Sequence, residues 1–161
     1  MTYKSENEAN LSVVNSFGEY GFVIINTHGD YNGFAIKSEI SKFSTAKADS
    51  TEYSVAELKN ILASAAGLPL SKISSGELKL STIVHYNGNN ASIKIEGKMG
   101  IIVTDKYVKS MPAMKNAIVF GNYCFSGYAR ENNIPEAFKS IGAKSFCSAT
   151  IADSTLWNLS E

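Results

Sequence analysis

The fold class is indicated most clearly by Ala117-Ile-Val-Phe-Gly-Asn-Tyr-Cys124, which Phe-Ser-Gly127 continues. A continuous apolar run rich in β-branched and aromatic residues is typical of a strand buried on both faces, as in a parallel sheet. Two further runs of this kind are Gly21-Phe-Val-Ile-Ile-Asn-Thr27 and residues 143–149. The sequence therefore predicts three buried strands of one mainly parallel sheet.

Helical patterns lie between and around these strands. Ser54, with Glu57 three residues later, forms a capping box before an amphipathic stretch, and Thr104 is the expected N-cap of a shorter helix. The expected helices cover about 9–17, 54–66, 105–110 and 134–141. Apolar strands that alternate with helices predict the α/β fold class.

An antiparallel insert interrupts this alternation. Asn87-Gly88 is a strong hairpin signal, and strand-like runs flank it over 77–86 and 91–96. We therefore expect a β-hairpin around 77–96, which residues 100–103 continue. The whole of 1–161 is expected to form a single domain, since this length suffices for one core.

Composition excludes several classes of function. The 15 basic and 15 acidic residues give a net charge of zero, so no basic face for nucleic acid is expected. Arg130 is the one arginine, which argues against arginine clamps on phosphate or carboxylate groups. No apolar run is long enough for a membrane span. The polar start has no signal-peptide core, so the chain is either cytoplasmic or a fragment of a longer, exported protein.

Two chemistry-bearing residues follow the predicted strands. His28 comes directly after the first apolar run, and Cys124 ends the second. If these strands are parallel neighbours, about 5 Å apart, a thiol and an imidazole meet at the carboxyl edge of the sheet. Cysteine as a nucleophile needs such a base, and the N–H groups of Gly29 and Cys124 could bind an oxyanion there. These parts suffice for acyl transfer through a thioester.

A plainer interpretation stays open. A cysteine that ends an apolar strand is usually a small buried hydrophobe, and His28-Gly29 by itself is usually a turn. Cys147 illustrates this, because we expect it to be part of the core. The two cysteines form neither a disulfide framework nor a zinc site, and no cofactor or metal is expected.

Two motifs resemble the caspase-like superfamily of cysteine peptidases. Phe22-Val-Ile-Ile-Asn-Thr-His28-Gly29 is similar to their histidine strand, and Ile118-Val-Phe-Gly-Asn-Tyr-Cys124-Phe-Ser-Gly127 to the cysteine strand of the bacterial gingipain- and clostripain-like branches. The order of His before Cys agrees, and residues 134–146 are similar to the next helix and strand. The resemblance covers about 21–153 but is weak across 50–100.

The resemblance implies a three-layer αβα fold and a cysteine endopeptidase. Cys124 would be the nucleophile, His28 the base and proton donor, and Gly29 and Cys124 the oxyanion hole. Peptides or proteins would be the substrates. In the clostripain-like branch, an acidic residue in the loop after the next strand selects Arg or Lys, and Asp153 lies at that place. Asn122, two positions before the nucleophile, would be the second substrate-binding residue beside Asp153. It replaces an acid common in that branch, which argues against basic specificity.

The chain also departs from that family. Two strands normally precede the histidine strand, but only about 20 residues precede it here, and their pattern is helical. The chain is then a trimmed form of the fold, or a fragment or subunit of a longer peptidase that associates with a missing N-terminal segment. The alternative function is a catalytically inactive caspase-like binding module.

Overall fold

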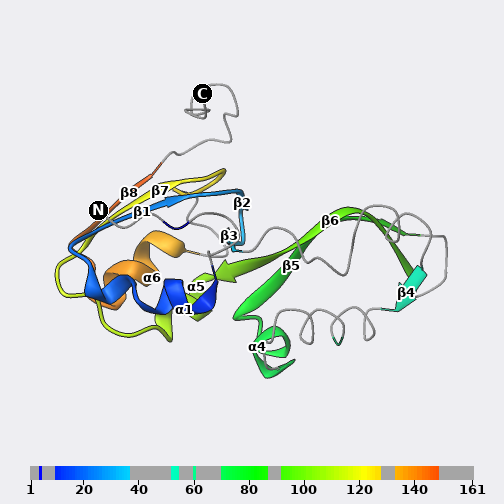
Figure 1. Ribbon diagram of the computed structural model, residues 1–161, viewed down its shortest axis with the longest axis horizontal. Helices are drawn as coiled ribbons and strands as arrows, with labels where there is room; N and C mark the ends of the chain where they lie inside the picture. The colour runs from blue at the N-terminus through cyan, green and yellow to red at the C-terminus, as the bar shows by residue number, and fades with distance from the viewer. Residues whose placement is uncertain are drawn as a thin grey trace.

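The computed structural model describes residues 4, 10–36, 52–54, 60, 70–86, 92–127 and 133–148, and of 52–54, 80–86 and 92–100 the backbone alone. These parts contain a three-stranded parallel sheet and a five-stranded antiparallel sheet, with short helices packed against them (Figure 1). The predicted α/β class, with a parallel sheet and a β-hairpin beside it, is confirmed.

The parallel sheet is built from the three predicted apolar runs. Its strands are β1 (Phe22–Asn26), β7 (Ile118–Asn122) and β8 (Ser145–Ser148), in the order β1-β7-β8. The register pairs Phe22 with Ile118 and continues without a bulge to Asn26 and Asn122. Because β7 is the central strand, the cysteine strand has a parallel neighbour on both sides.

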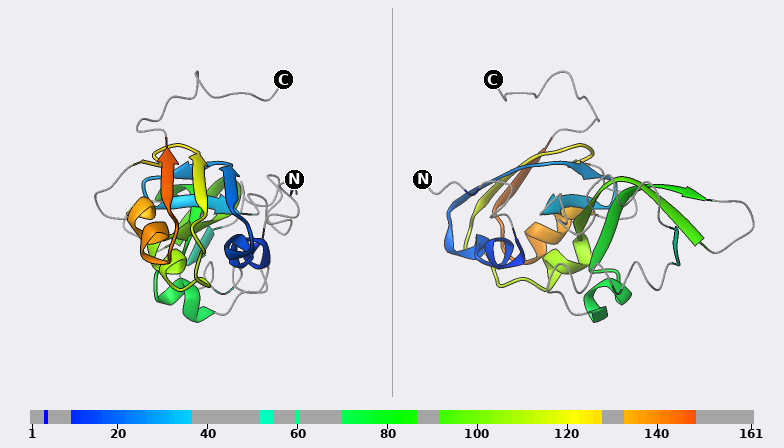
Figure 2. Two further views of the ribbon diagram at one scale, coloured as in Figure 1. Left: turned by 90° about the vertical axis from the view of Figure 1, so that its left-hand side faces the viewer. Right: turned by 45° about the vertical axis from the view of Figure 1, so that its right-hand side comes forward.

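The described helices cover one face of this sheet. Figure 2 (left) shows the three strands side by side, with the helices below them. Phe138 is fully buried beneath the sheet and stacks on both Phe34 and Phe146, with ring centroids 6.4 and 5.5 Å apart. These helices are α1 (Leu11–Asn15), α5 (Asp105–Lys109) and α6 (Ile134–Ser140), and a 3-10 turn, η1 (Phe17–Glu19), follows α1. The second helical layer expected from the resemblance is not among the described residues.

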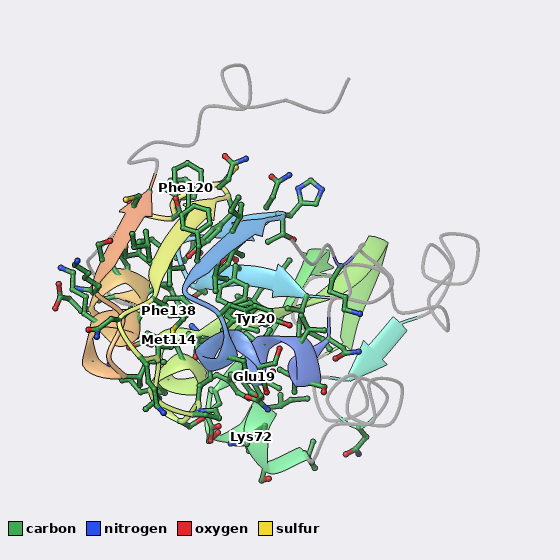
Figure 3. The ribbon with its side chains drawn as sticks, turned by 60° about the vertical axis from the view of Figure 1, so that its left-hand side comes forward. Glu19, Tyr20, Lys72, Met114, Phe120 and Phe138 are labelled. Atoms are coloured by element: carbon green, nitrogen blue, oxygen red, sulfur yellow. The ribbon has the colours of Figure 1, made fainter. Side chains whose placement is uncertain are left out.

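The other face of the parallel sheet is exposed in the described structure. Phe22 and Ile24 on β1 are 57% and 50% exposed, while their neighbours Val23 and Ile25 are buried. Figure 3 shows Phe120 on this outer side and Phe138 on the inner side. The prediction that these strands are buried on both faces is therefore wrong for β1.

Strand alternation also decides the position of Cys147. On β8, Phe146 points into the core, so that the next residue, Cys147, lies on the opposite face and is exposed. The expectation that Cys147 is a core residue is wrong. The sequence around it, Ser145-Phe-Cys-Ser148, carries apolar character on both faces and does not distinguish the two registers.

The antiparallel sheet contains the predicted hairpin. Its two long strands, β5 (Leu78–Tyr86) and β6 (Ser92–Thr104), form a ribbon that extends away from the parallel sheet (Figures 1 and 2). The hairpin is confirmed, and β6 is one strand through the segments expected as two. The short strands β2 (Gly29–Asp30), β3 (Gly33–Ile36) and β4 (Glu52–Ser54) complete the sheet. The C-terminal end of β6 packs into the core, where Ile101 and Val103 are buried.

Local capping explains where the short helices begin. Asn10 caps α1, since its Oδ1 accepts hydrogen bonds from the N–H groups of Ser12 and Val13. Asn133 caps α6 in the same way. The helix predicted after Thr104 is confirmed as α5, and Thr104 is its N-cap residue. Its side chain makes no capping hydrogen bond, and its hydroxyl donates to the carbonyls at 76 and 77. A short helix, α4 (Leu70–Ser74), precedes β5. The helix predicted over 54–66 lies outside the described residues, apart from positions 54 and 60.

Candidate active site

Parallel pairing brings the segments of His28 and Cys124 together. Strands β1 and β7 are neighbours and parallel, as predicted, and their last register pair is Asn26 with Asn122. Pairing continues past the strands, because the Thr27 N–H donates to the Asn122 carbonyl at 3.4 Å. His28 and Cys124 each lie two residues beyond the last pair, at the same carboxyl edge. Adjacent strands are about 4.8 Å apart, so the two backbone segments leave the sheet at the same edge.

The His28 backbone is fixed by strand β3. Its carbonyl accepts a hydrogen bond from the Ala35 N–H at 2.8 Å, and the Thr27 hydroxyl donates to the Ala35 carbonyl at 3.0 Å. The first of these bonds makes His28 and Ala35 a hydrogen-bonded pair. Since such pairs alternate in an antiparallel ladder, the next pair, Gly29 and Phe34, has no hydrogen bonds between its two backbones. The Gly29 N–H therefore points away from β3.

Asp30 shapes the turn that follows. Its carboxylate accepts hydrogen bonds from the Asn32 backbone N–H at 2.7 Å and from the Asn32 side-chain amide at 3.2 Å. Lys79 Nζ donates to Asn32 Oδ1 at 2.6 Å and ties the turn to strand β5. Asp30 is thus a turn residue, which is the role its place after the His-Gly pair suggests.

Cys124 lies in a tight turn directly after β7. The Ser126 N–H donates to the Tyr123 carbonyl at 3.1 Å, so that Cys124 and Phe125 are the two central residues of a four-residue turn. Phe125 has φ of 60°, a value that type II turns require at this position and that glycine usually supplies. A bulky residue there costs about 1–3 kcal/mol. Backbone strain of this kind is concentrated at functional sites, and here it lies next to the candidate nucleophile.

Aromatic contacts join the two turns. The Tyr31 ring meets the Phe125 ring edge-on, with centroids 6.4 Å apart. On the inner side, the Tyr123 ring packs against Gly29. Two contacts, Tyr31 with Phe125 and Gly29 with Tyr123, therefore join the turn after His28 to the turn that contains Cys124. Sequence reasoning missed all three aromatic residues, since their contacts join positions far apart in the chain.

Asn122 is hydrogen-bonded to a second asparagine, Asn26, at the edge of the sheet. Its Nδ2 donates to Asn26 Oδ1 at 2.9 Å across the two strands. Asn26 was missed by sequence reasoning, although it precedes His28 by the same two positions that separate Asn122 from Cys124. The predicted substrate-binding residue is therefore half of a carboxamide pair next to the candidate dyad. Asp153, the other predicted substrate-binding residue, lies outside the described residues.

Two searches of the described residues bear on other kinds of site. No three His, Cys, Asp or Glu side chains in these parts are grouped closely enough to hold a metal ion. Within the same residues, no helix has the length and apolar character needed to cross a membrane.

Comparison with known proteins gives no match. No protein-family model, no curated protein and no solved structure is similar to the chain at a significant level.

Proposed function

We propose that the protein is a cysteine endopeptidase that uses Cys124 as nucleophile and His28 as base and proton donor. The observation that carries this proposal is the parallel pairing of β1 with β7, which brings the residues after both strands to one edge of the sheet. The contact between the Tyr31 and Phe125 rings supports it, because it keeps the two turns together. The resemblance of both motifs to caspase-like peptidases supplies the reaction class.

The chemistry follows from the groups at this edge. Cys124 gives its proton to His28, and the sulfur attacks the carbonyl carbon of the scissile bond. The N–H groups of Gly29 and Cys124 would bind the negative oxygen of the tetrahedral intermediate. His28 then protonates the leaving amine as the C–N bond breaks, which leaves a thioester. Water attacks the thioester, its proton passes through His28 to the sulfur, and the carboxylic acid leaves.

The test is hydrolysis of a mixed peptide library. Cys124→Ala and His28→Ala should each lower kcat by about 10⁴-fold or more, since both groups act in the same step. Cys147→Ala is the matched control, because it removes the exposed thiol on β8, and it should leave kcat within about twofold. Hydrolysis that survives the loss of Cys124 would overturn the proposal.

Cleavage after Arg or Lys is the proposed specificity. It rests on the place of Asp153 in the sequence, after the third strand, by analogy with the clostripain-like branch. The Asp153→Ala variant should lose kcat/KM for substrates with Arg before the scissile bond but not for those with Gln. Full activity of this variant on Arg substrates would exclude Asp153 as the recognition residue.

A second candidate is an inactive caspase-like binding module or a subunit of a larger peptidase. The exposed outer face of β1 favours it, since parallel sheets are normally covered on both faces. The library assay distinguishes the two candidates, because a binding module hydrolyses nothing and is unaffected by Cys124→Ala.

A further inference from the structure

Tyr123 is the residue that precedes the candidate nucleophile, and it points away from the site. Its side chain lies on the inner side of β7, and the residue is 5% exposed. The ring packs against the Phe34 ring, with centroids 5.7 Å apart. It thus lies in the core directly beneath the edge where His28 and Cys124 emerge.

Two glycines make room for this ring. A Cβ at Gly29 would overlap the Tyr123 ring and would lie 2.8 Å from the Gly33 carbonyl oxygen. A Cβ at Gly121 would lie 3.0 Å from the ring and 2.7 Å from that of Phe146. Real Cβ atoms essentially never come within 3.0 Å of other atoms, and a contact of 3.0 Å is tighter than nine in ten real ones. The ring therefore fills the space that Gly29 on β2 and Gly121 on β7 leave open.

The hydroxyl of Tyr123 does not account for this packing. Among the described residues it is buried without a hydrogen-bond partner. Burial raises the pKa of this phenol well above its ordinary value of 10.0, so that it stays neutral. An unpaired buried hydroxyl costs about 1–3 kcal/mol. The contribution of Tyr123 to the fold thus comes from its ring.

We infer that Tyr123 is a positioning residue whose ring sets the spacing between the Gly29 N–H and Cys124. The ring is covalently next to Cys124 and in contact with Gly29, so a shorter side chain would let the His28–Gly29 turn settle inward. This inference rests on the proposed function, because the spacing matters only if both turns act on one substrate. Misplacement by about 1 Å can cost about 100-fold in rate.

The experiment compares two tyrosines that are equally buried. Tyr107 on α5 is also 5% exposed, but its contacts are with Asn15 and Lys72, away from the two turns. Tyr123→Leu should lower kcat by about 10- to 100-fold with little change in KM. Tyr107→Leu should lose stability to a similar extent but keep kcat within about twofold. Tyr123→Phe keeps the ring and should restore kcat.

A second readout does not depend on turnover. Iodoacetamide alkylates both thiols, and mass spectrometry gives the ratio of modified Cys124 to modified Cys147. Tyr123→Leu should lower this ratio at neutral pH, while Tyr107→Leu should not. If Tyr123→Leu does not fold, Tyr123→Met serves instead, because methionine fills irregular gaps.

The outcomes separate the two proposals. If the wild-type protein hydrolyses peptides and Tyr123→Leu matches Tyr107→Leu in kcat and in alkylation ratio, the positioning role is wrong and the peptidase stands. If the wild-type protein hydrolyses nothing, and iodoacetamide modifies its Cys147 faster than its Cys124, the peptidase proposal fails. The positioning role then fails with it.

Discussion

Thr27→Val tests how strand β3 holds the histidine turn. Valine has the shape of threonine but cannot donate a hydrogen bond. The N–H and C=O of Ala35 point to the same side of β3, since the N–H donates to the His28 carbonyl there. The Ala35 carbonyl thus faces residues 27 and 28 rather than β6, and the Thr27 hydroxyl is its partner at 3.0 Å. Ala35 is buried, so the variant leaves a buried acceptor without its donor.

The expected loss is about 1–3 kcal/mol in the free energy of unfolding. For a chain of this size, each kcal/mol corresponds to about 2–4 °C in Tm. Urea and thermal unfolding, followed by circular dichroism, measure both. Thr27→Ser is the matched control, because it keeps the hydroxyl and removes one methyl group, worth less than about 0.8 kcal/mol. If the serine variant loses as much stability as the valine variant, the hydrogen bond does not hold the turn.

Three further predictions concern stability. Phe125→Gly relieves the positive φ but loses a ring contact, so we expect a net change below about 1 kcal/mol, whereas Phe125→Val should cost more. Urea unfolding decides this, and equal costs would contradict the strain. Ile25→Ala should cost about 2–5 kcal/mol, and Ile24→Ala less than half as much, because Ile24 is 50% exposed. Equal losses would mean that the outer face is covered. Lys72 donates to Glu77 and lowers the pKa of this carboxyl, so the contact stabilises the fold above pH 4.5 and is lost as the pH falls through the lowered value. Glu77→Gln should therefore lose less than about 1 kcal/mol in the free energy of unfolding at neutral pH. The difference in Tm from wild type should vanish in acid. A difference that grows in acid would contradict this sign.

The parts of the fold that depend on local patterns could be predicted from the sequence. The apolar runs ending at Thr27 and Cys124 are long and free of charge, and they are the parallel strands. Asn87-Gly88 is also a local signal, because few residue pairs favour the tight turn that joins the two strands of a hairpin. The common edge for His28 and Cys124 then followed from one assumption, that the two strands are neighbours.

The parts that depend on distant contacts could not be predicted. Nothing in an all-apolar run indicates that Phe22 and Ile24 are exposed, because that depends on which layers cover the sheet. Thr104 is the N-cap residue of α5, but its hydroxyl donates to carbonyls of a distant segment and accepts no hydrogen bond from the N–H groups of the helix. Tyr123 is part of the same apolar run as its neighbours, and its contact with Gly29 depends on tertiary packing.

The relative reactivity of the two cysteines tests whether His28 activates Cys124. Cys147 is exposed and Cys124 is half-buried, so accessibility alone favours alkylation of Cys147. If His28 activates Cys124 across the edge of the sheet, iodoacetamide at neutral pH should modify Cys124 first, and His28→Ala should reverse the order. Faster modification of Cys147 in the wild-type protein would show that His28 does not activate Cys124.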